Sequence, residues 1–338
     1  MKKTLVALAV AAVAATSANA TVVYNQDGTK IGVSGRVALV VSKTKETRTD
    51  LYDNGSRFRI DASQELGTGF SALGAAELRF GNKNNEFKDI VLKRLYAGLK
   101  HDNVGTLTFG KQLTIGDDVT VADYTYNGFG ANTVISSGDK VIRLQSPDLD
   151  GLTLEADYVF SGSNKKGEPN ADGFVVGAKY ETSYDDFGVN LIAAYSQKRI
   201  AEHKVDKVES HKLKGLAVGA EVSHGPVAVA FNWANEKGTP STEAGKLKRD
   251  LFEVGAKYQF TDVNSIYGQY YWGNGKLTKA DKTTKGKLKG WFVGADHKFA
   301  KNVLVYLEGG KSKGEVGLAD MSKDGKEKVV HAGLRVLF

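Results

Sequence analysis

The sequence predicts an all-β fold: a closed antiparallel β-barrel of about sixteen strands that crosses a membrane. Three observations support this prediction. Segments of about ten residues alternate apolar with polar or small side chains throughout the chain. No apolar run after residue 20 approaches the ~20 residues that a spanning helix needs. Short and long connectors alternate between the segments, as in barrels with tight turns at one end and large loops at the other.

The first twenty residues form a separate segment. Lys2 and Lys3 precede an apolar run over 5–15, and residues 18–20 (Ala-Asn-Ala) fit the small-x-small rule for cleavage. A permanent membrane anchor is the alternative, but the apolar run is short for that role. We therefore expect a signal peptide over 1–20, cleaved after Ala20, and one barrel domain over 21–338.

The alternation itself fits two architectures. Residues 31–41, 252–260 and 329–338 place apolar side chains at every second position, which gives each strand one apolar and one polar face. A soluble sandwich turns its apolar face inward to a core, whereas a transmembrane barrel turns it outward to lipid. Periodicity alone does not separate these cases.

The connectors do separate them. Short turns are expected at 66–69, 102–105, 148–151, 185–188, 223–226, 261–264 and 300–302, and longer charged, Gly-rich stretches at 43–54, 81–89, 111–139, 162–172, 198–212, 236–248, 277–286 and 313–326. This rhythm places all short turns at one end and predicts an outer-membrane barrel of about sixteen strands. Such a barrel encloses more space than side chains fill, so a water-filled channel is expected.

Strand parity identifies candidate residues of a pore constriction. The basic side chains expected on one arc of the lumen wall are Arg36, Arg57, Arg59, Lys93 and Arg143, with the acid Glu77 among them. A solvated wall is the simpler interpretation of lumen-facing charge. However, like charges at close range are unfavourable unless acids oppose them, so an acidic partner is expected.

The connector 111–139 is the longest and is unusually apolar and aromatic for an external loop. A long loop with its own packing residues is expected to fold into the cavity. Folded inward, Asp117, Asp118 and Asp123 would face the arginine arc and create a transverse field at a narrow waist.

The chain resembles the general diffusion porins of Gram-negative outer membranes, within the OmpC/OmpF-like matrix porins and most closely the major porins of Pasteurellaceae. The segments that carry this resemblance are 23–30, 35–36, 55–59, 65–70, 96–100, 104–111, 143–147 and 333–338. By position, Arg36, Arg57 and Lys93 match the basic cluster of that family, Arg143 matches it more loosely, and Glu77 is the accompanying acid. Residues 127–132 lack both acids of the enteric loop motif, which weakens the expectation of cation preference.

The resemblance implies a homotrimer of sixteen-stranded barrels and a terminal Phe338 that marks the chain for barrel assembly. It also implies contacts with outer-membrane lipid and lipopolysaccharide, periplasmic chaperones and the barrel-assembly machinery, and passage of ions and small hydrophilic solutes. The net charge of +7, or +5 without Lys2 and Lys3, is too diffuse to indicate a nucleic-acid partner.

Enzyme chemistry is not indicated. The chain has no Cys, its six His are scattered, and no nucleophile motif is present, so we expect no catalytic residues, no metal and no cofactor. Two other functions stay open at this point. A substrate-selective channel would need lumen-facing aromatic residues in a row, and the sequence shows none outside the long loop; a surface adhesin or structural barrel would act through its external loops alone.

Overall fold

The computed structural model describes residues 20–45, 47–83, 86–161, 172–203, 208–239, 245–279, 282–314 and 326–338. The predicted signal peptide lies outside this part of the chain, apart from Ala20. The strands are β1 (Thr21–Gln26), β2 (Thr29–Thr44), β3 (Asp50–Asp53), β4 (Arg57–Gly67), β5 (Phe70–Lys83), β6 (Glu86–His101), β7 (Gly105–Leu113), β8 (Ser137–Gln145), β9 (Leu152–Val159), β10 (Gly173–Tyr184), β11 (Phe187–His203), β12 (Val208–His224), β13 (Val227–Gly238), β14 (Lys246–Gln259), β15 (Asn264–Lys279), β16 (Lys282–Ala300), β17 (Val303–Lys313) and β18 (Lys326–Leu337).

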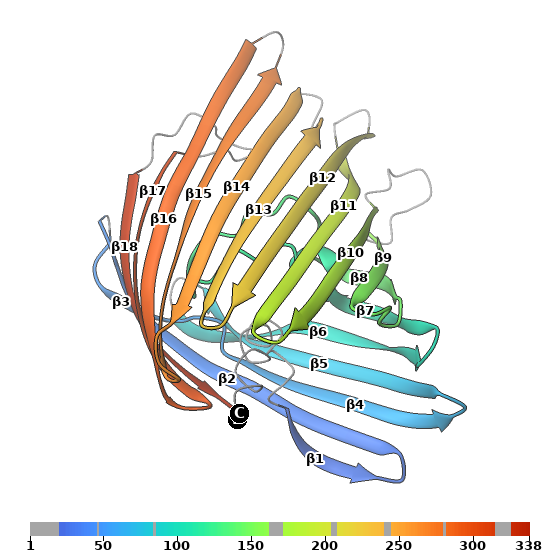
Figure 1. Cartoon of the computed structure of the whole chain (residues 1–338). Coiled ribbons are helices and arrows are strands. Elements are labelled where there is room, and N and C mark those ends of the chain that lie inside the picture. Colours follow the sequence, from blue (N-terminus) through green and yellow to red (C-terminus); the bar gives the residue numbers. More distant parts are fainter. Residues whose placement is uncertain are drawn as a thin grey trace.

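These strands form one antiparallel sheet that closes on itself, because β18 pairs with β2 (Figure 1). The predicted barrel of about sixteen strands is confirmed: β2 and β4 to β18 make the sixteen-stranded wall. The two remaining strands, β1 and β3, are short and both pair with β2. A tight turn joins β1 to β2, and its Asp27 (φ 50°) and Gly28 (φ 75°) have the positive φ angles that such hairpins need.

The chain ends where the barrel closes. Phe338 donates its backbone N–H to the carbonyl of Gly35 (3.0 Å) and accepts from the Gly35 N–H (2.7 Å). Its ring lies directly over Gly35, where an added Cβ would approach ring carbons to 2.5 Å. Only glycine leaves room for this contact, so the last residue and the first barrel strand fit each other.

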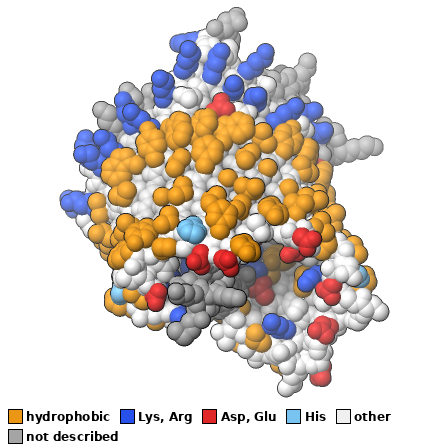
Figure 2. Space-filling model, in the orientation of Figure 1, with side chains coloured by type: hydrophobic (Ala, Val, Ile, Leu, Met, Phe, Trp, Pro, Cys, Tyr) orange, Lys and Arg blue, Asp and Glu red, His pale blue; other side chains and the backbone are white. Residues whose placement is uncertain are grey.

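The alternation of side chains turns apolar residues outward. On β13, Val229 and Phe231 are exposed, whereas their neighbours Ala230 and Asn232 face the interior and are buried. Figure 2 shows the outcome as a broad apolar band across the face of the wall that it displays. Lipid chains cannot form hydrogen bonds with backbone N–H and C=O groups. A closed sheet pairs these groups between neighbouring strands all round the wall. The described residues contain no helix that is long and apolar enough to cross a membrane.

The short turns fall where the sequence predicts them, between β4 and β5, β6 and β7, β8 and β9, and onward to β16 and β17. Several stretches expected to be long loops are mostly strand instead. β5 and β6 pair as far as Lys83 and Glu86, inside the predicted connector 81–89, and β15 and β16 pair as far as Lys279 and Lys282. Charge and glycine do not end these strands, because beyond the membrane both faces of the sheet meet water.

Candidate functional site

The loop over 114–136, between β7 and β8, lies inside the barrel and is called the inner loop below. It begins with a short 3-10 helix, Ile115–Asp117, whose Thr114 side chain accepts from the Gly116 N–H. Its apolar residues pack against apolar lumen-facing residues of β10 to β14, many of them Ala, and form the one large buried apolar cluster of the described chain. The predicted inward folding of this connector is therefore confirmed.

Polar wall side chains hold the backbone of the inner loop. Glu308 accepts from the N–H of Tyr126 at 2.6 Å, and Glu253 accepts from the N–H of Ala131 at 2.9 Å. Asn232 accepts from the Ala122 N–H at 2.6 Å and donates to the carbonyl of Val119. Glu253 and Asn232 are fully buried, so these bonds satisfy groups that would otherwise be buried without partners.

Aromatic rings of the wall hold the tip of the loop. Tyr126 stacks on Tyr306 with ring centroids 4.3 Å apart and meets Tyr267 edge-on at 5.6 Å. Phe129 stacks on Tyr271 at 4.6 Å. The sequence analysis expected no row of lumen-facing aromatic residues outside the loop, as a substrate-selective channel would need. Tyr267, Tyr271 and Tyr306 face inward, but each is only 4% exposed and lies beneath the loop, so they anchor it and form no exposed track.

Opposite the inner loop, arginines from neighbouring strands form an arc on the wall. The register places Arg36 of β2 beside Arg57 of β4, and Arg57 beside Arg79 of β5. Glu77 lies among them: Arg79 Nε donates to its carboxylate at 2.6 Å, and Arg57 Nη1 lies 3.9 Å from it. One buried acid therefore serves several guanidinium groups, and the arc keeps an excess of positive charge.

Two other predicted wall residues each pair with a separate acidic residue. Arg59 donates to both oxygens of Asp61, at 2.8 Å and 2.6 Å, and also to the hydroxyl of Tyr96. Arg143 lies on β8, further round the wall, and donates to Glu155 at 2.6 Å. The charge of Arg143 is largely balanced on the wall, whereas Arg36 donates its Nε only to the backbone carbonyl of Gly55.

Lys93 lies at an irregularity that the sequence did not reveal. The pairing of β5 with β6 shifts between Glu77 and Leu78, so that Glu77 pairs with Arg94 and Leu78 with Leu92. Lys93 is the extra residue of this bulge. The bulge changes the strand parity, so Arg94 is buried beside Glu77, although its alternation with Lys93 suggested the opposite face.

Arg335 of β18 is a second arginine that sequence reasoning missed. Its guanidinium carbon lies 4.3 Å from the ring centroid of Tyr126 and 5.7 Å from that of Tyr306. Its charge also acts on Arg36 and Arg57 across the β18–β2 junction. Arg335 therefore links the arginine arc to the tip of the inner loop.

The inner-loop acids divide into two groups. Burial raises the pKa of Asp117, as does the charge of Asp118, and Arg94 and Arg79 oppose this rise. Burial also raises the pKa of Asp118, against the charges of Lys179 and Arg143. Both residues remain exposed. The basic residues that act on Asp117 include Arg94 and Arg79 of the arc, and those that act on Asp118 are Lys179 and Arg143.

Asp123 differs from the expectation that it faces the arginine arc. Burial raises its pKa to about 6, against two hydrogen bonds from Thr125 and with the charge of Glu308 nearby. Thr125 donates both its backbone N–H and its hydroxyl to one Asp123 oxygen. No basic residue acts on Asp123 in the described part of the chain. The fold of the loop tip, which the sequence does not reveal, turns this carboxylate toward the acidic wall.

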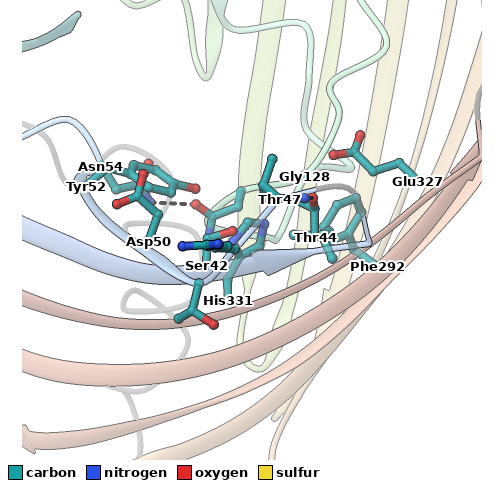
Figure 3. Close-up of a pocket in the computed structure, with 14 residues that line it drawn as sticks. Ser42, Thr44, Thr47, Asp50, Tyr52, Asn54, Gly128, Phe292, Glu327 and His331 are labelled. Carbon is teal, nitrogen blue, oxygen red and sulfur yellow. Dashed lines mark hydrogen bonds between the residues drawn. The ribbon is translucent and has the colours of Figure 1, made fainter. Parts of the chain in front are cut away.

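On the loop side of the constriction, a cavity of about 800 Å³ lies between β2, β18 and the loop tip (Figure 3). Polar side chains dominate its lining, including Ser42, Tyr52, Asn54 and His331. Asn54 connects this vestibule to the loop, because its amide donates to Asn127 at 2.9 Å. Among the described residues, no group of His, Asp or Glu could hold a metal ion. Hydrogen-bonding groups therefore line this space.

Known proteins share both the sequence and the architecture. The family model described as Gram-negative porin matches residues 7–316. A major outer membrane protein of Pasteurella multocida (strain Pm70) is 46% identical over 288 residues, which covers 79% of this chain and 82% of the relative. Two solved structures match with a TM-score of 0.72 and 17% identity, over 92% of this chain and 100% of theirs: the trimer form of OmpT from Vibrio cholerae and an anion-selective porin from Comamonas acidovorans.

The closed barrel, the loop that narrows its lumen and the sequence match over most of the chain agree with one another. The chain belongs to the Gram-negative porin family, and it is a general diffusion porin of the outer membrane.

Proposed function

We propose that the narrowest part of this channel lies between the arginine arc and the inner-loop acids Asp117 and Asp118, and that it favours anions. The arc comprises Arg36, Arg57, Arg59, Arg79, Arg94 and Arg335, with Glu77 and Asp61 as its wall acids. The two loop acids do not balance the remaining positive charge. This excess of positive charge is the observation that carries the proposal.

Opposed charges across a narrow, water-filled gap orient water and dipolar solutes. Small hydrophilic solutes gain favourable contacts with both charged walls, whereas an apolar solute would have to displace water from both. The channel therefore passes ions and small hydrophilic solutes by diffusion, with no chemical step. Lys93 and Arg143 belong to the approach of the constriction: Lys93 lies at the bulge, and Glu155 pairs with Arg143.

The functional unit is a homotrimer. The outer face of the barrel supports this proposal, because the outward residues near the loop ends of β4 to β6 are apolar: Phe58, Ile60, Leu78, Phe80, Ile90 and Leu92. On the other side of the barrel, lysines occupy the corresponding positions. An apolar arc without charge suits contact between protomers, and the lysine-rich side suits the lipid leaflet.

The precursor is exported by the leader over 1–20, which is removed after Ala20. Phe338 then marks the chain for the periplasmic chaperones and the barrel-assembly machinery. The contact of its ring with Gly35 supports a second role in closing the barrel.

Planar-bilayer recordings test the selectivity directly. With a tenfold KCl gradient, an anion-favouring waist gives a reversal potential displaced toward the chloride equilibrium potential. A reversal potential displaced toward the potassium equilibrium potential would contradict the proposal. Liposome swelling with neutral sugars of increasing size measures diffusion through the channel. The swelling rate should fall continuously as the sugar becomes larger, and it should not saturate as the sugar concentration rises.

A further inference from the structure

A second cavity, of about 310 Å³, lies in the lumen where the inner loop returns to the wall. We call this part of the loop, residues 132–136, the return limb. The wall side of the cavity comes from β11 to β14 and includes Ser196, Lys198, Glu236 and Arg249. These residues lie near the strand ends that adjoin the long connectors, so the cavity lies toward the loop end of the barrel. It shares no lining residue with the vestibule.

The return limb is fixed to the wall by hydrogen bonds. Ile135 donates its backbone N–H to the hydroxyl oxygen of Ser196 at 3.2 Å. Thr133 donates its hydroxyl to the backbone carbonyl of Asn235 at 2.9 Å. Both sides of the cavity are therefore held in place before any solute arrives. A solute that binds here does not have to order the loop first, which favours binding of small molecules.

The charged residues of the cavity leave one lysine unpaired. Arg249 Nε lies 2.9 Å from a carboxylate oxygen of Glu236, and Glu236 is buried, so these two charges largely cancel. Lys198 is exposed, and it forms no ion pair with any residue that the structure describes. The cavity therefore keeps one positive charge, and its one acid is already paired.

Two serines add hydrogen-bond donors that are not in use. Ser136 and Ser137 line the cavity at the junction of the return limb and β8. Among the described residues, neither hydroxyl forms a hydrogen bond. Each hydroxyl can donate one hydrogen bond, and the lysine ammonium can donate three. An ammonium with two hydroxyls suits an oxyanion, whereas a cation would find no free carboxylate here.

Apolar side chains flank the unpaired lysine. On one side, the register pairs Lys198 with Leu213 of β12. On the other side, Lys198 Cβ and Ile135 Cδ1 lie 3.1 Å and 2.8 Å from the place that a Cβ at Gly173 would occupy, so the two side chains are neighbours. Ile135 and Leu213 both line the cavity. A solute that satisfies the whole lining therefore carries an anionic group and a short apolar part.

We propose that this cavity binds small aliphatic carboxylates, of which propionate is the simplest probe. The carboxylate accepts from Lys198, Ser136 and Ser137, and the alkyl chain contacts Ile135 and Leu213. Hydrogen bonds between charged partners are about twice as strong as neutral ones. The space equals the liquid volume of roughly ten water molecules, which accommodates an acid of three or four carbons.

Such a site would collect small organic acids on the loop side of the constriction, before they pass through it. The inference rests on the proposed function only in taking the lumen as open to small solutes. It does not depend on the charge preference of the constriction, because binding to the cavity is measured without any current.

Line broadening of propionate measures the binding directly. Propionate labelled with ¹³C at its carboxyl group is added to the whole protein in a non-ionic detergent and 0.1 M KCl. We expect the carboxyl signal to broaden and the broadening to saturate as propionate increases. Unlabelled formate, acetate and butyrate then compete, and each added methylene should strengthen binding by up to about fourfold. Propionamide, which has nearly the same shape without the charge, should not compete.

The test variant is Lys198→Gln with Ser136→Ala and Ser137→Ala, and it leaves Arg249 in place as the partner of Glu236. A hydrogen bond to a charged group contributes roughly tenfold or more to binding, so the triple variant should bind propionate about 100-fold more weakly. Lys198→Arg, which keeps the charge, should bind nearly as well as the wild type. The folded band on gels of unheated samples shows that each variant retains its barrel.

The control makes the same three changes outside the cavity: Lys214→Gln, Ser71→Ala and Ser183→Ala. Lys214 lies next to Leu213 on β12 but faces outward, and the two serines lie at the opposite end of the barrel. This variant should bind propionate like the wild type.

Three results would overturn the proposal. Wild-type affinity in the triple variant would place the propionate elsewhere. Competition by propionamide equal to that of propionate, or equal competition by formate and butyrate, would remove the charged or the apolar contact. Inorganic phosphate that displaces propionate at a lower concentration than butyrate does would assign the cavity to phosphate instead of a carboxylate.

Discussion

Replacing Asn232 with alanine tests how the inner loop is held in the lumen. The Asn232 side chain is fully buried on β13 and bonds both the N–H of Ala122 and the carbonyl of Val119. Asn232→Ala leaves both backbone groups buried without partners, at about 1–3 kcal/mol each. The local free energy that holds this segment against the wall should fall by about 2–6 kcal/mol. Even the lower figure raises the population of the detached segment about 30-fold.

The assay is single-channel recording. A segment that leaves the wall partly blocks the lumen, so Asn232→Ala should show more open-channel noise and should close at lower applied voltage. The control is Asn235→Ala on the same strand, whose side chain faces outward and bonds Asp250. It should record like the wild type. If Asn232→Ala shows wild-type noise and closure voltage, these two hydrogen bonds do not hold the loop.

Three further predictions concern barrel closure and pH. Deletion of Phe338 should sharply reduce the amount of protein in the outer membrane while export continues, which fractionation and immunoblotting would measure; an unchanged yield would contradict the assembly role. Gly35→Val should lower the temperature at which the folded barrel unfolds, measured as the loss of the faster-migrating folded band on gels of heated samples, because the valine side chain would occupy the place of the Phe338 ring. Burial raises the pKa of Asp123 to about 6, so this carboxylate should gain its charge as pH rises from about 5 to about 7. The reversal potential should move toward cation preference over this range, Asp123→Asn should remove most of that movement, and Asp102→Asn at the opposite end should not.

The raised pKa of Asp123 also bears on stability. A carboxyl whose pKa is higher in the folded than in the unfolded state favours folding at low pH. This contribution is present below its unfolded pKa of about 4 and is lost as pH rises through about 6. Asp123→Asn should therefore raise thermal stability at pH 7 more than at pH 4.

Most of the fold could be predicted from the sequence, because a barrel wall repeats one local rule. Side chains alternate with period two, and Asp-Gly or similar pairs occupy the tight turns, so each strand can be identified from its own residues. The inward folding of the inner loop was also predictable. Residues such as Ile115, Val119 and Val121 are too apolar for a loop in water, and the wall of β10 to β14 supplies their partners.

The constriction was less accessible to sequence reasoning, because it depends on register and on loop conformation. A single bulge at Lys93 changes the parity of β6 and places Arg94 beside Glu77. Arg335 joins the arc only because β18 closes against β2. Nothing in the residues around Asp123 indicates that it turns toward Glu308 instead of the arginines.

The outward lysines beyond the apolar band on β12 to β18 show the same limit from the outside of the barrel. In the sequence these lysines belong with the charged loops, since they lie in or next to the predicted long connectors 198–212, 236–248, 277–286 and 313–326. The strands extend through most of these connectors, and their register brings the lysines into one row. A diffuse net charge in the sequence thus becomes an ordered surface in the structure.

The most direct test of the account compares two charge changes at the waist by their reversal potentials in a tenfold KCl gradient. One variant is Arg36→Ser with Arg57→Ser, and the other is Asp117→Asn with Asp118→Asn. Both charge sets act on the same ion path and lie within about one Debye length of it, ~10 Å at 0.1 M salt. Loss of the arginines should move selectivity toward cations, and loss of the loop acids should move it toward anions. If both variants keep the wild-type reversal potential, or move it in the same direction, the constriction does not lie between these residues.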